Sequence, residues 1–443
     1  MLGQAATHAL LGETASLELE PAMARLEYIR YEFFDASLSD NDELDWIKQS
    51  KTPIDRLPQI FWNDGSSWHE ANLWALDRAA SNRIDVETSK RTMKHLHHYA
   101  NFLESREIDW RHFPVRKDTQ VLRMYRKRLI EERDDGILAS TTASNCMSTV
   151  IQFYRFADAH NLVDANAPMW INQLAVIPFH DATGFKRTMV RLSCDLSIPN
   201  RKRVGNLLED GLLPLRSDHM SKLLAYTAKH ETNELHLMLS AGFFTGARLG
   251  TVTTLTVTSV HTAREDPHTP GVFRLPVGPG TGVATKFSVA GELVVPEALL
   301  VDLKAYASST TRLLREAKAK AEHKNLLFLS RRAQPYTVGT VDRLVNEMRK
   351  RAVNAGMQFM EHFKFHQSRA TFGTWLTQLL LESCTDTAEA IGIVRDAMLH
   401  KDERTTFGYI KFLENTRAKK QAAADFNEAF TGLGNRNWND ADA

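Results

Sequence analysis

The sequence predicts a mostly helical α+β protein with a small antiparallel sheet. Apolar residues recur at helical spacing over most of the chain. In the C-terminal half, three short segments are rich in β-branched and aromatic residues and are joined by glycine-containing turns, which predicts a small sheet: VFRLPV, TKFSV and GELVVP. TVTTLTV just before them fits a helix or a strand equally well. At 443 residues the chain is too long for one ordinary domain, so we expect two or three.

The composition is that of a globular protein with real cores, at 43% hydrophobic and 25% charged residues. The formal net charge of +1 means that a nucleic-acid partner would be met by local basic patches. Cys146, Cys194 and Cys384 are far apart, which argues against a cysteine-ligated zinc site and a disulfide framework. We see no signal peptide and no apolar run long enough to span a bilayer, and we expect a cytoplasmic protein.

The N-terminal half divides into two segments. Residues 1–85 form an N-terminal extension that contains four of the tryptophans. It is either an accessory DNA-binding or oligomerisation module, or a helical addition packed on the next domain, and the second interpretation is favoured. Residues 86–182 predict a compact helical domain, in which basic side chains of the second and third helices either contact DNA phosphates or form a solvated face.

A basic linker and a second large domain follow. Residues 183–204 predict a linker, because Pro199 interrupts regular structure and six basic residues face one acid, Asp195. Such a connector is suited to crossing a DNA duplex. Residues 205–443 predict a second domain that ends in a helix and a polar tail.

Two arginines and a histidine of the second domain are suited to holding a phosphate. Arg248 follows a Gly246–Ala247 turn at the end of an apolar helix, which places a guanidinium at the edge of a core. A planar guanidinium can bind two non-bridging phosphate oxygens at once. His366 and Arg369 are three residues apart, so they share one face at the start of a helix, where the dipole favours an anion.

A histidine, a tyrosine and a lysine complete the set. His400 precedes Tyr409 by nine residues, and Thr405 and Thr406 are suited to capping the short helix that presents Tyr409. A phenol is a poor nucleophile at its free pKa of about 10, but converging arginines stabilise the phenolate and the charge that builds on phosphorus. Lys286 is placed to protonate a leaving 5′ oxygen. Each signal alone is weak, but together they predict attack of a tyrosine on a phosphodiester.

Two other motifs are set aside. GPGTGVATK lacks the adjacent Gly-Lys-Ser/Thr and the strand-to-helix context of a nucleotide-binding loop, so nucleotide hydrolysis is rejected. HLHHY at residues 95–99 has no partnering acids or cysteines, so a surface helix is expected rather than a metal site.

The order of these groups resembles the tyrosine recombinases, the phage integrase family. TGARLG resembles the box of the family's first arginine, HQSRATFGTWL its HxxR box, and LHKDERTTFGY its final box with the same histidine-to-tyrosine spacing. The resemblance extends from about residue 86, where the helical segment is similar to the family's core-binding domain, to about residue 430. Two positions depart from the family pattern: Thr251 replaces an acid and Leu399 replaces a glycine.

The resemblance implies a role for each residue. Arg248 and Arg369 would clamp the scissile phosphate, His366 would act as general acid/base and phosphate ligand, and His400 would bind a non-bridging oxygen. Lys286 would be the general acid and Tyr409 would form a 3′-phosphotyrosine. Because that bond keeps the phosphodiester energy, the resemblance implies neither ATP nor a metal cofactor.

The resemblance also implies partners. We expect a two-domain clamp on double-stranded DNA, four protomers on two DNA sites, a nucleoid-associated location, a mobile genetic element as the source, and accessory DNA-bending or partner recombinase proteins. The tail helix, with Phe412, Phe426 and Phe430, docks either on a neighbouring protomer or on its own domain. The rival functions are a type IB topoisomerase or telomere resolvase, and a DNA-binding regulator of the same fold without catalysis.

Overall fold

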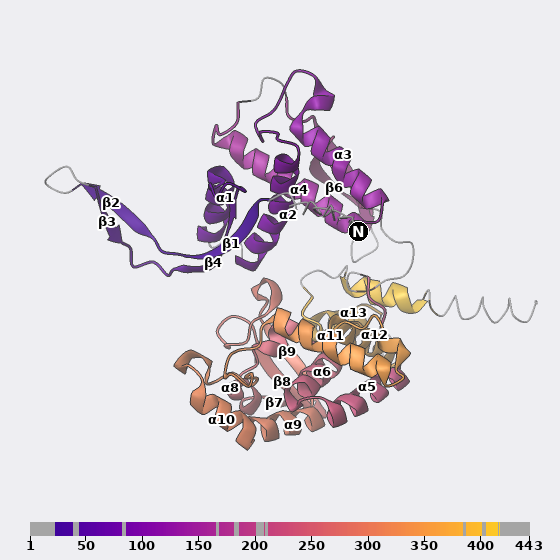
Figure 1. The fold of residues 1–443 in the computed structure, drawn as a ribbon. Helices are drawn as coiled ribbons and strands as arrows, with labels where there is room; N and C mark the ends of the chain where they lie inside the picture. The colour runs from indigo at the N-terminus through magenta and orange to yellow at the C-terminus, as the bar shows by residue number, and fades with distance from the viewer. Residues whose placement is uncertain are drawn as a thin grey trace, which may run out of the picture. The chain divides into compact units, whose positions relative to one another are not determined.

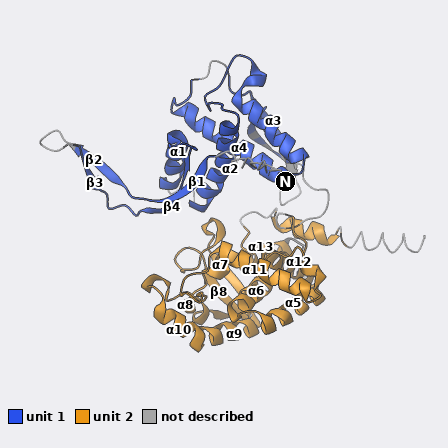
Figure 2. Ribbon diagram, viewed as in Figure 1, with its two compact units in different colours: residues 1–203 blue, residues 204–443 orange. Residues whose placement is uncertain are grey.

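The computed structural model describes the chain with gaps and divides it into two compact units, residues 1–203 and 204–443 (Figure 2). The described residues are 23–38, 44–81, 86–164, 168–180, 186–200, 208, 211–383, 387–400, 405–414 and 416. Mostly helices with small antiparallel sheets make up both units, as the sequence predicts. Among the described helices, none is long and apolar enough to cross a membrane.

A β-ribbon opens the first unit. Strand β1 (Arg25–Tyr31) pairs antiparallel with β4 (Ile54–Phe61), and β2 (Phe34–Leu38) pairs antiparallel with β3 (Leu44–Lys48). Figure 1 shows β2 and β3 projecting from the helices of this unit. These four strands were not predicted, since the favoured interpretation of residues 1–85 was a helical addition.

Four helices form the body of the first unit: α1 (His69–Ala80), α2 (Val86–Ser105), α3 (Val121–Asp134) and α4 (Ser140–Ala159), with the 3-10 turn η1 (Lys117–Thr119). Their core is aromatic. Trp68 is fully buried against Tyr99, Trp110 and Phe153, and the hydroxyls of Tyr99 and Tyr154 are hydrogen-bonded at 2.7 Å. Because Trp68 comes from the N-terminal extension and the others from the helical segment, the two share one core.

The first unit ends in a hairpin that the sequence did not predict. Strand β5 (Asn172–His180) pairs antiparallel with β6 (Lys186–Cys194), so Lys186–Cys194 is a strand and not part of a linker. The alternation of Val190 and Leu192 with more polar residues has the period of a strand, but the local basic charge favoured a linker in the sequence.

The second unit places a three-stranded sheet among helices. Helices α5 (Ser217–His230), α6 (Asn233–Thr245), α7 (Leu249–Thr253) and α8 (Val257–His261) precede the antiparallel strands β7 (Arg264–Asp266), β8 (Thr269–Val277) and β9 (Gly291–Pro296), in that spatial order. TVTTLTV is neither one helix nor a strand: its first three residues end α7, its last begins α8, and Thr256 between them forms an isolated β-bridge with Leu326. TKFSV was wrongly predicted as a strand, since Lys286–Ser288 is the 3-10 turn η2 and Phe287 and Ser288 have positive φ.

The remaining helices and 3-10 turns complete the hydrophobic core of the second unit. They are α9 (Glu297–Ala307), α10 (Thr310–Lys318), η3 (Ala321–His323), α11 (Val338–Asn354), η4 (Gln358–Met360), α12 (His366–Ser383) and α13 (Thr387–Ala397), and residues 405–414 are also helical. The apolar α6 is buried on almost every side, and α12 packs along it. The starts of α7 and α12 therefore lie on a fixed support.

Candidate active site of the second unit

Arg248 is positioned by a left-handed turn. Helix α6 ends at Gly246, which has φ of +64°, and Arg248 is the N-cap residue of α7 two positions later. A side chain at Gly246 would also collide with the ring of Phe372 in α12. Residue 246 must therefore be glycine for two reasons, its left-handed backbone and the lack of space for a side chain. Arg248 is half-buried at the end of the core.

Arg369 joins the separate segments of the site. Its side chain is 1% exposed, Nη1 donates to the carbonyl of Gly246 at 2.6 Å, and Nη2 donates to the carbonyl of Met398 at 2.5 Å. A buried guanidinium is tolerated only when its donors are paired. Arg369 therefore holds the turn before Arg248 and the segment before His400 against one helix.

His366 is the first residue of α12 and is half-buried. The helix approaches α6 closely, because a Cβ on Gly242 would collide with the hydroxyl of Ser368 and the ring of Phe365. The free N–H groups at a helix start attract an anion. His366 consequently lies where a phosphate is favoured, one turn before the buried Arg369.

His400 and Tyr409 pack together. His400 is 7% exposed, its Nδ1 is hydrogen-bonded to the hydroxyl of Thr406 at 2.9 Å, and its ring stacks on that of Tyr409 with centroids 6.0 Å apart. Tyr409 is 1% exposed. Its ring fits because residue 373 of α12 is glycine: a Cβ there would lie 2.5 Å from Cε1 of Tyr409.

Leu399 adopts a backbone conformation that usually belongs to glycine. Its φ is +50°, and its side chain is half-buried against Gly291 of β9. A left-handed leucine costs about 1–2 kcal/mol. Leucine makes this turn at the position where the resemblance led us to expect glycine, and the packing of its side chain holds the His400 segment against the sheet.

The comparison of sequences decides the family. Residues 214–415 match the profile described as the phage integrase family. The second unit is a tyrosine recombinase catalytic domain. The chain therefore contains the catalytic domain of a family of DNA-cleaving and DNA-rejoining enzymes.

Solved structures of integrases also match the recombinase. One is the Tn1549 transposon integrase in complex with circular intermediate DNA, at 15% identity, TM-score 0.46, and coverage of 77% of this chain and 94% of that chain. Another is a lambda integrase dimer bound to a core site, at 14% identity, TM-score 0.45, and coverage of 77% and 94%. No curated protein matches the chain.

Lys286 lies in a different setting from the other five predicted residues of the recombinase. It is exposed on the turn between β8 and β9, and its Nζ lies 5.1 Å from the ring centroid of Phe287. The structure links Arg369, His400 and Tyr409 through direct contacts and shared segments, and attaches Arg248 and His366 through α6 and α12. It gives no such link for Lys286 among the described contacts.

The sequence missed two supporting residues. Thr406 was assigned to helix capping, but its hydroxyl is bonded to His400. Gly373, four residues after Arg369, makes room for Tyr409. The spacing of Gly373 after Arg369 is the signal that places it on the same face of α12.

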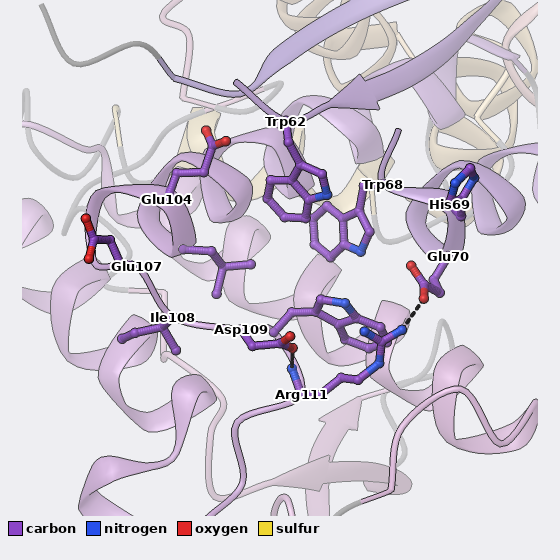
Figure 3. Close-up of a pocket in the computed structure, with 11 residues that line it drawn as sticks. Trp62, Trp68, His69, Glu70, Glu104, Glu107, Ile108, Asp109 and Arg111 are labelled. Carbon is purple, nitrogen blue, oxygen red and sulfur yellow. Dashed lines mark hydrogen bonds and ion pairs between the residues drawn. The ribbon is translucent and has the colours of Figure 1, made fainter. Parts of the chain in front are cut away.

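A pocket in the first unit has the wrong charge for a phosphate. Figure 3 shows Trp62 and Trp68 stacked in a cavity of about 540 Å³, with four acids around it. Arg111 is bonded there to Glu70. The acids are Glu70, Glu104, Glu107 and Asp109. Repulsion of an anion makes this pocket unsuitable for the DNA backbone.

The basic residues of α3 are partly occupied within the first unit. Arg123 pairs with Asp195 at 2.6 Å, Nε of Arg126 donates to the carbonyl of Leu196 at 3.1 Å, and Arg128 pairs with Glu132 at 2.7 Å. Arg123 and Arg126 thereby fasten the segment that follows β6. Their predicted contact with DNA phosphates stays a prediction.

Proposed function

We propose that the recombinase cleaves and rejoins duplex DNA with Tyr409 as the nucleophile, through a 3′-phosphotyrosine intermediate. Tyr409 gives its hydroxyl proton to His366 as its oxygen attacks phosphorus, the bond from phosphorus to the 5′ oxygen breaks, and that oxygen takes a proton from Lys286 and leaves as a hydroxyl. Attack by a 5′ hydroxyl on the phosphotyrosine reverses each change and restores Tyr409. The observation that carries this proposal is the guanidinium of Arg369 bound to both segments that present Arg248 and His400, with Tyr409 stacked on His400.

The other five residues would stabilise the phosphate and move the proton. Arg248 and Arg369 would bind the non-bridging oxygens, His400 would donate to one of them, and His366 at the helix start would bind the phosphate and exchange a proton. Lys286 would protonate the 5′ oxygen. Its exposed turn would have to reach the phosphate when DNA binds.

Because Tyr409 is buried, its helix must move before a DNA phosphate can reach its hydroxyl oxygen. The side chain is 1% exposed beside Gly373 and Met398. A phosphate of duplex DNA reaches its oxygen only if the helix at residues 405–414 shifts away from α12. We infer that binding of DNA at Arg248 and His366 favours this shift, since a ligand stabilises the conformation that it binds better.

Four protomers on two DNA sites follow from the reaction. Exchange between two duplexes requires cleavage of four strands, and each protomer supplies one Tyr409. Accessory DNA-bending or partner proteins, a nucleoid-associated location and origin in a mobile element belong to the same proposal.

The first experiment uses DNA that the inactive recombinase selects. A duplex library is enriched on the Tyr409→Phe variant, and the selected site is made with a nick near the cleavage point, so that the short cleaved fragment diffuses away. The wild-type chain is expected to accumulate covalently bound to this DNA, with or without a chelator, and Tyr409→Phe is expected to give none. Covalent capture by Tyr409→Phe would overturn the assignment of the nucleophile.

Lys286 has a sharper test of its own. Lys286→Ala is expected to slow cleavage by about 10²–10⁴-fold, the usual contribution of a general acid. A substrate with sulfur in place of the bridging 5′ oxygen needs no acid, since thiols have pKa values near 8.5, so it should be cleaved at equal rates by both enzymes. Lys304→Ala, which removes another lysine that lies over an aromatic ring, serves as the control. A slow Lys286→Ala variant on both substrates would show that the lysine is not the acid.

A further inference from the structure

The segment between β8 and β9, which we name the lysine turn (residues 278–290), has an anchored backbone although Lys286 itself is exposed. Gly278 has φ of +105°, and a Cβ there would lie 2.5 Å from the carbonyl oxygen of Val289, so the two ends of the turn are in close contact. The amide of Gly278 donates to the carbonyl of Val283 at 2.9 Å, and the side chain of Val283 is 1% exposed in the core of the second unit. The turn is therefore fixed to the core before the chain reaches Lys286.

A second set of bonds closes the turn around Lys286. The hydroxyl of Thr285 donates to the carbonyl of Val289 at 2.6 Å, and the amide of Ser288 donates to the carbonyl of Thr285 at 3.2 Å. Phe287 and Ser288 have φ of +63° and +51°, a left-handed conformation that is unfavourable for residues other than glycine. Such a conformation persists only where the surrounding contacts hold it, so these bonds fix the backbone at Lys286.

Thr254 joins the lysine turn to the helix that follows Arg248. Its half-buried hydroxyl accepts a hydrogen bond from the amide of Ala284 at 2.9 Å and donates to the carbonyl of Gly250 at 2.9 Å. Arg248 is the N-cap residue of α7 and Thr254 is its C-cap residue. A helix of five residues is about 8 Å long, so α7 is a short spacer between Arg248 and the backbone of the lysine turn.

We propose that Thr254 is a positioning residue for the transfer of a proton from Lys286 to the leaving 5′ oxygen. The inference rests on the proposed function of Lys286 as the general acid. The phosphate that Arg248 binds and the ammonium group of Lys286 must meet at one bond of the DNA, so the relative position of the two side chains affects the rate. The Thr254 hydroxyl holds that relative position through Ala284, which lies two residues before Lys286.

The test compares two substrates, the nicked duplex with its bridging 5′ oxygen and the same duplex with sulfur at that position. Thr254→Val and Thr254→Ala both remove the hydroxyl, Thr254→Ser keeps it, and Lys286→Ala removes the acid. Thr232→Val is the matched control, because the Thr232 hydroxyl also accepts a backbone amide, that of Leu235 at 3.3 Å, but at the opposite end of α6 from Arg248. Loss of the Thr254 hydroxyl is expected to slow cleavage of the oxygen substrate by about 10–100-fold and to leave the sulfur substrate unchanged, since a thiolate leaves without an acid.

Thr254→Ser and Thr232→Val are expected to cleave both substrates within about threefold of the wild-type rate. Thr254→Val combined with Lys286→Ala is expected to cleave the oxygen substrate no more slowly than Lys286→Ala alone, because residues that act as a unit have non-additive effects.

A purely structural role of Thr254 would slow both substrates in Thr254→Val and Thr254→Ala, and that result would overturn the inference. Wild-type rates for these two variants on the oxygen substrate, a Thr254→Ser variant as slow as Thr254→Ala, or losses that multiply in the double variant would overturn it as well. In each of these cases the acid role of Lys286 still stands if Lys286→Ala is slow on the oxygen substrate alone. Slow cleavage of both substrates by Lys286→Ala would instead overturn that acid role, and the inference with it.

Discussion

The two units of the recombinase bury different kinds of polar group. Apart from the carboxylate of Glu132, which is 7% exposed, the buried polar groups that the structure describes in the first unit are neutral: the hydroxyls of Tyr99 and Tyr154 bind each other, and His98 binds the hydroxyl of Tyr125 at 2.9 Å. The second unit buries full charges, among them the guanidinium groups of Arg312 and Arg369 at 2% and 1% exposure. Both guanidinium groups are held by backbone carbonyls.

This difference separates buried polar groups that only stabilise a unit from a buried group that also lies at the candidate active site. Neutral groups that hydrogen-bond each other stabilise a unit but provide no positive charge for a DNA phosphate. A buried arginine whose N–H groups bind two loops stabilises those loops and also places a positive charge beside them. Arg312 fixes loops away from Tyr409, because its Nη2 donates to the carbonyls of Lys324 and Leu326 at 2.7 and 3.0 Å. Arg369 fixes the loops of the site itself.

The largest expected effect separates these two arginines. Arg369→Lys keeps the charge but loses the fork that reaches Gly246 and Met398, so we expect cleavage of the nicked duplex to fall by about 10²–10³-fold. Arg312→Lys is expected to lower the unfolding temperature to a similar degree with cleavage changed by less than about threefold, since it lies outside the site. If both variants are folded and lose cleavage activity equally, the distinction drawn between the two buried arginines is wrong.

A smaller effect concerns the space beside Tyr409. Gly373→Ala places a Cβ 2.5 Å from the ring of Tyr409, so the ring must move, at a cost of about 1–3 kcal/mol in stability. We expect covalent capture to slow by about tenfold, because small misplacements of reacting groups are costly. Gly392→Ala in α13 is the control: nothing lies within 4 Å of the new methyl group, and alanine favours a helix by about 1 kcal/mol over glycine. Normal capture by Gly373→Ala would show that this packing does not position Tyr409.

The smallest effect tests the buried histidines of the first unit, of which His98 also lies 3.3 Å from the carboxylate of Glu132. Burial lowers the pKa of His98 and of His95, so the unfolded chain binds more protons than the folded chain at mildly acidic pH. The free energy of unfolding should therefore fall as pH drops below about 6.5, the pKa of an unperturbed histidine. Tryptophan fluorescence follows the unfolding of this unit, and His98→Gln should reduce the pH dependence. A pH dependence that is unchanged in His98→Gln would contradict the role of this residue.

How far the sequence predicted the structure differs between the units. In the second unit α5, α6, α9, α11, α12 and α13 and the strands at VFRLPV and GELVVP were predicted, because buried segments keep a clear apolar period, whereas α8 and α10 were not predicted. TKFSV failed because Phe287 and Ser288 turn the chain with positive φ, which side-chain pattern does not reveal. In the first unit the two hairpins were missed, since Leu174, Val176, Val190 and Leu192 face solvent and their basic neighbours suggested a linker.

Sequence spacing predicted which residues of the candidate site lie close together, but it did not predict the groups that hold them in place. His366 and Arg369 share the start of α12, and His400 stacks on Tyr409, as expected of residues at those separations. The carbonyls of Gly246 and Met398 that bind Arg369 carry no sequence signal, since every residue has a carbonyl. The predicted docking residues Phe426 and Phe430, and Cys384, lie outside the described residues, while Phe412 packs at the edge of the cluster that contains Tyr409.

The most direct test of the account is to identify the amino acid that carries the DNA. Wild-type protein captured on the nicked duplex is digested with nuclease and protease, and the peptide with the remaining nucleotide is sequenced by mass spectrometry. We predict that the nucleotide is attached through its 3′ phosphate to Tyr409. Attachment to any other residue, or through a 5′ phosphate, would contradict the proposed mechanism.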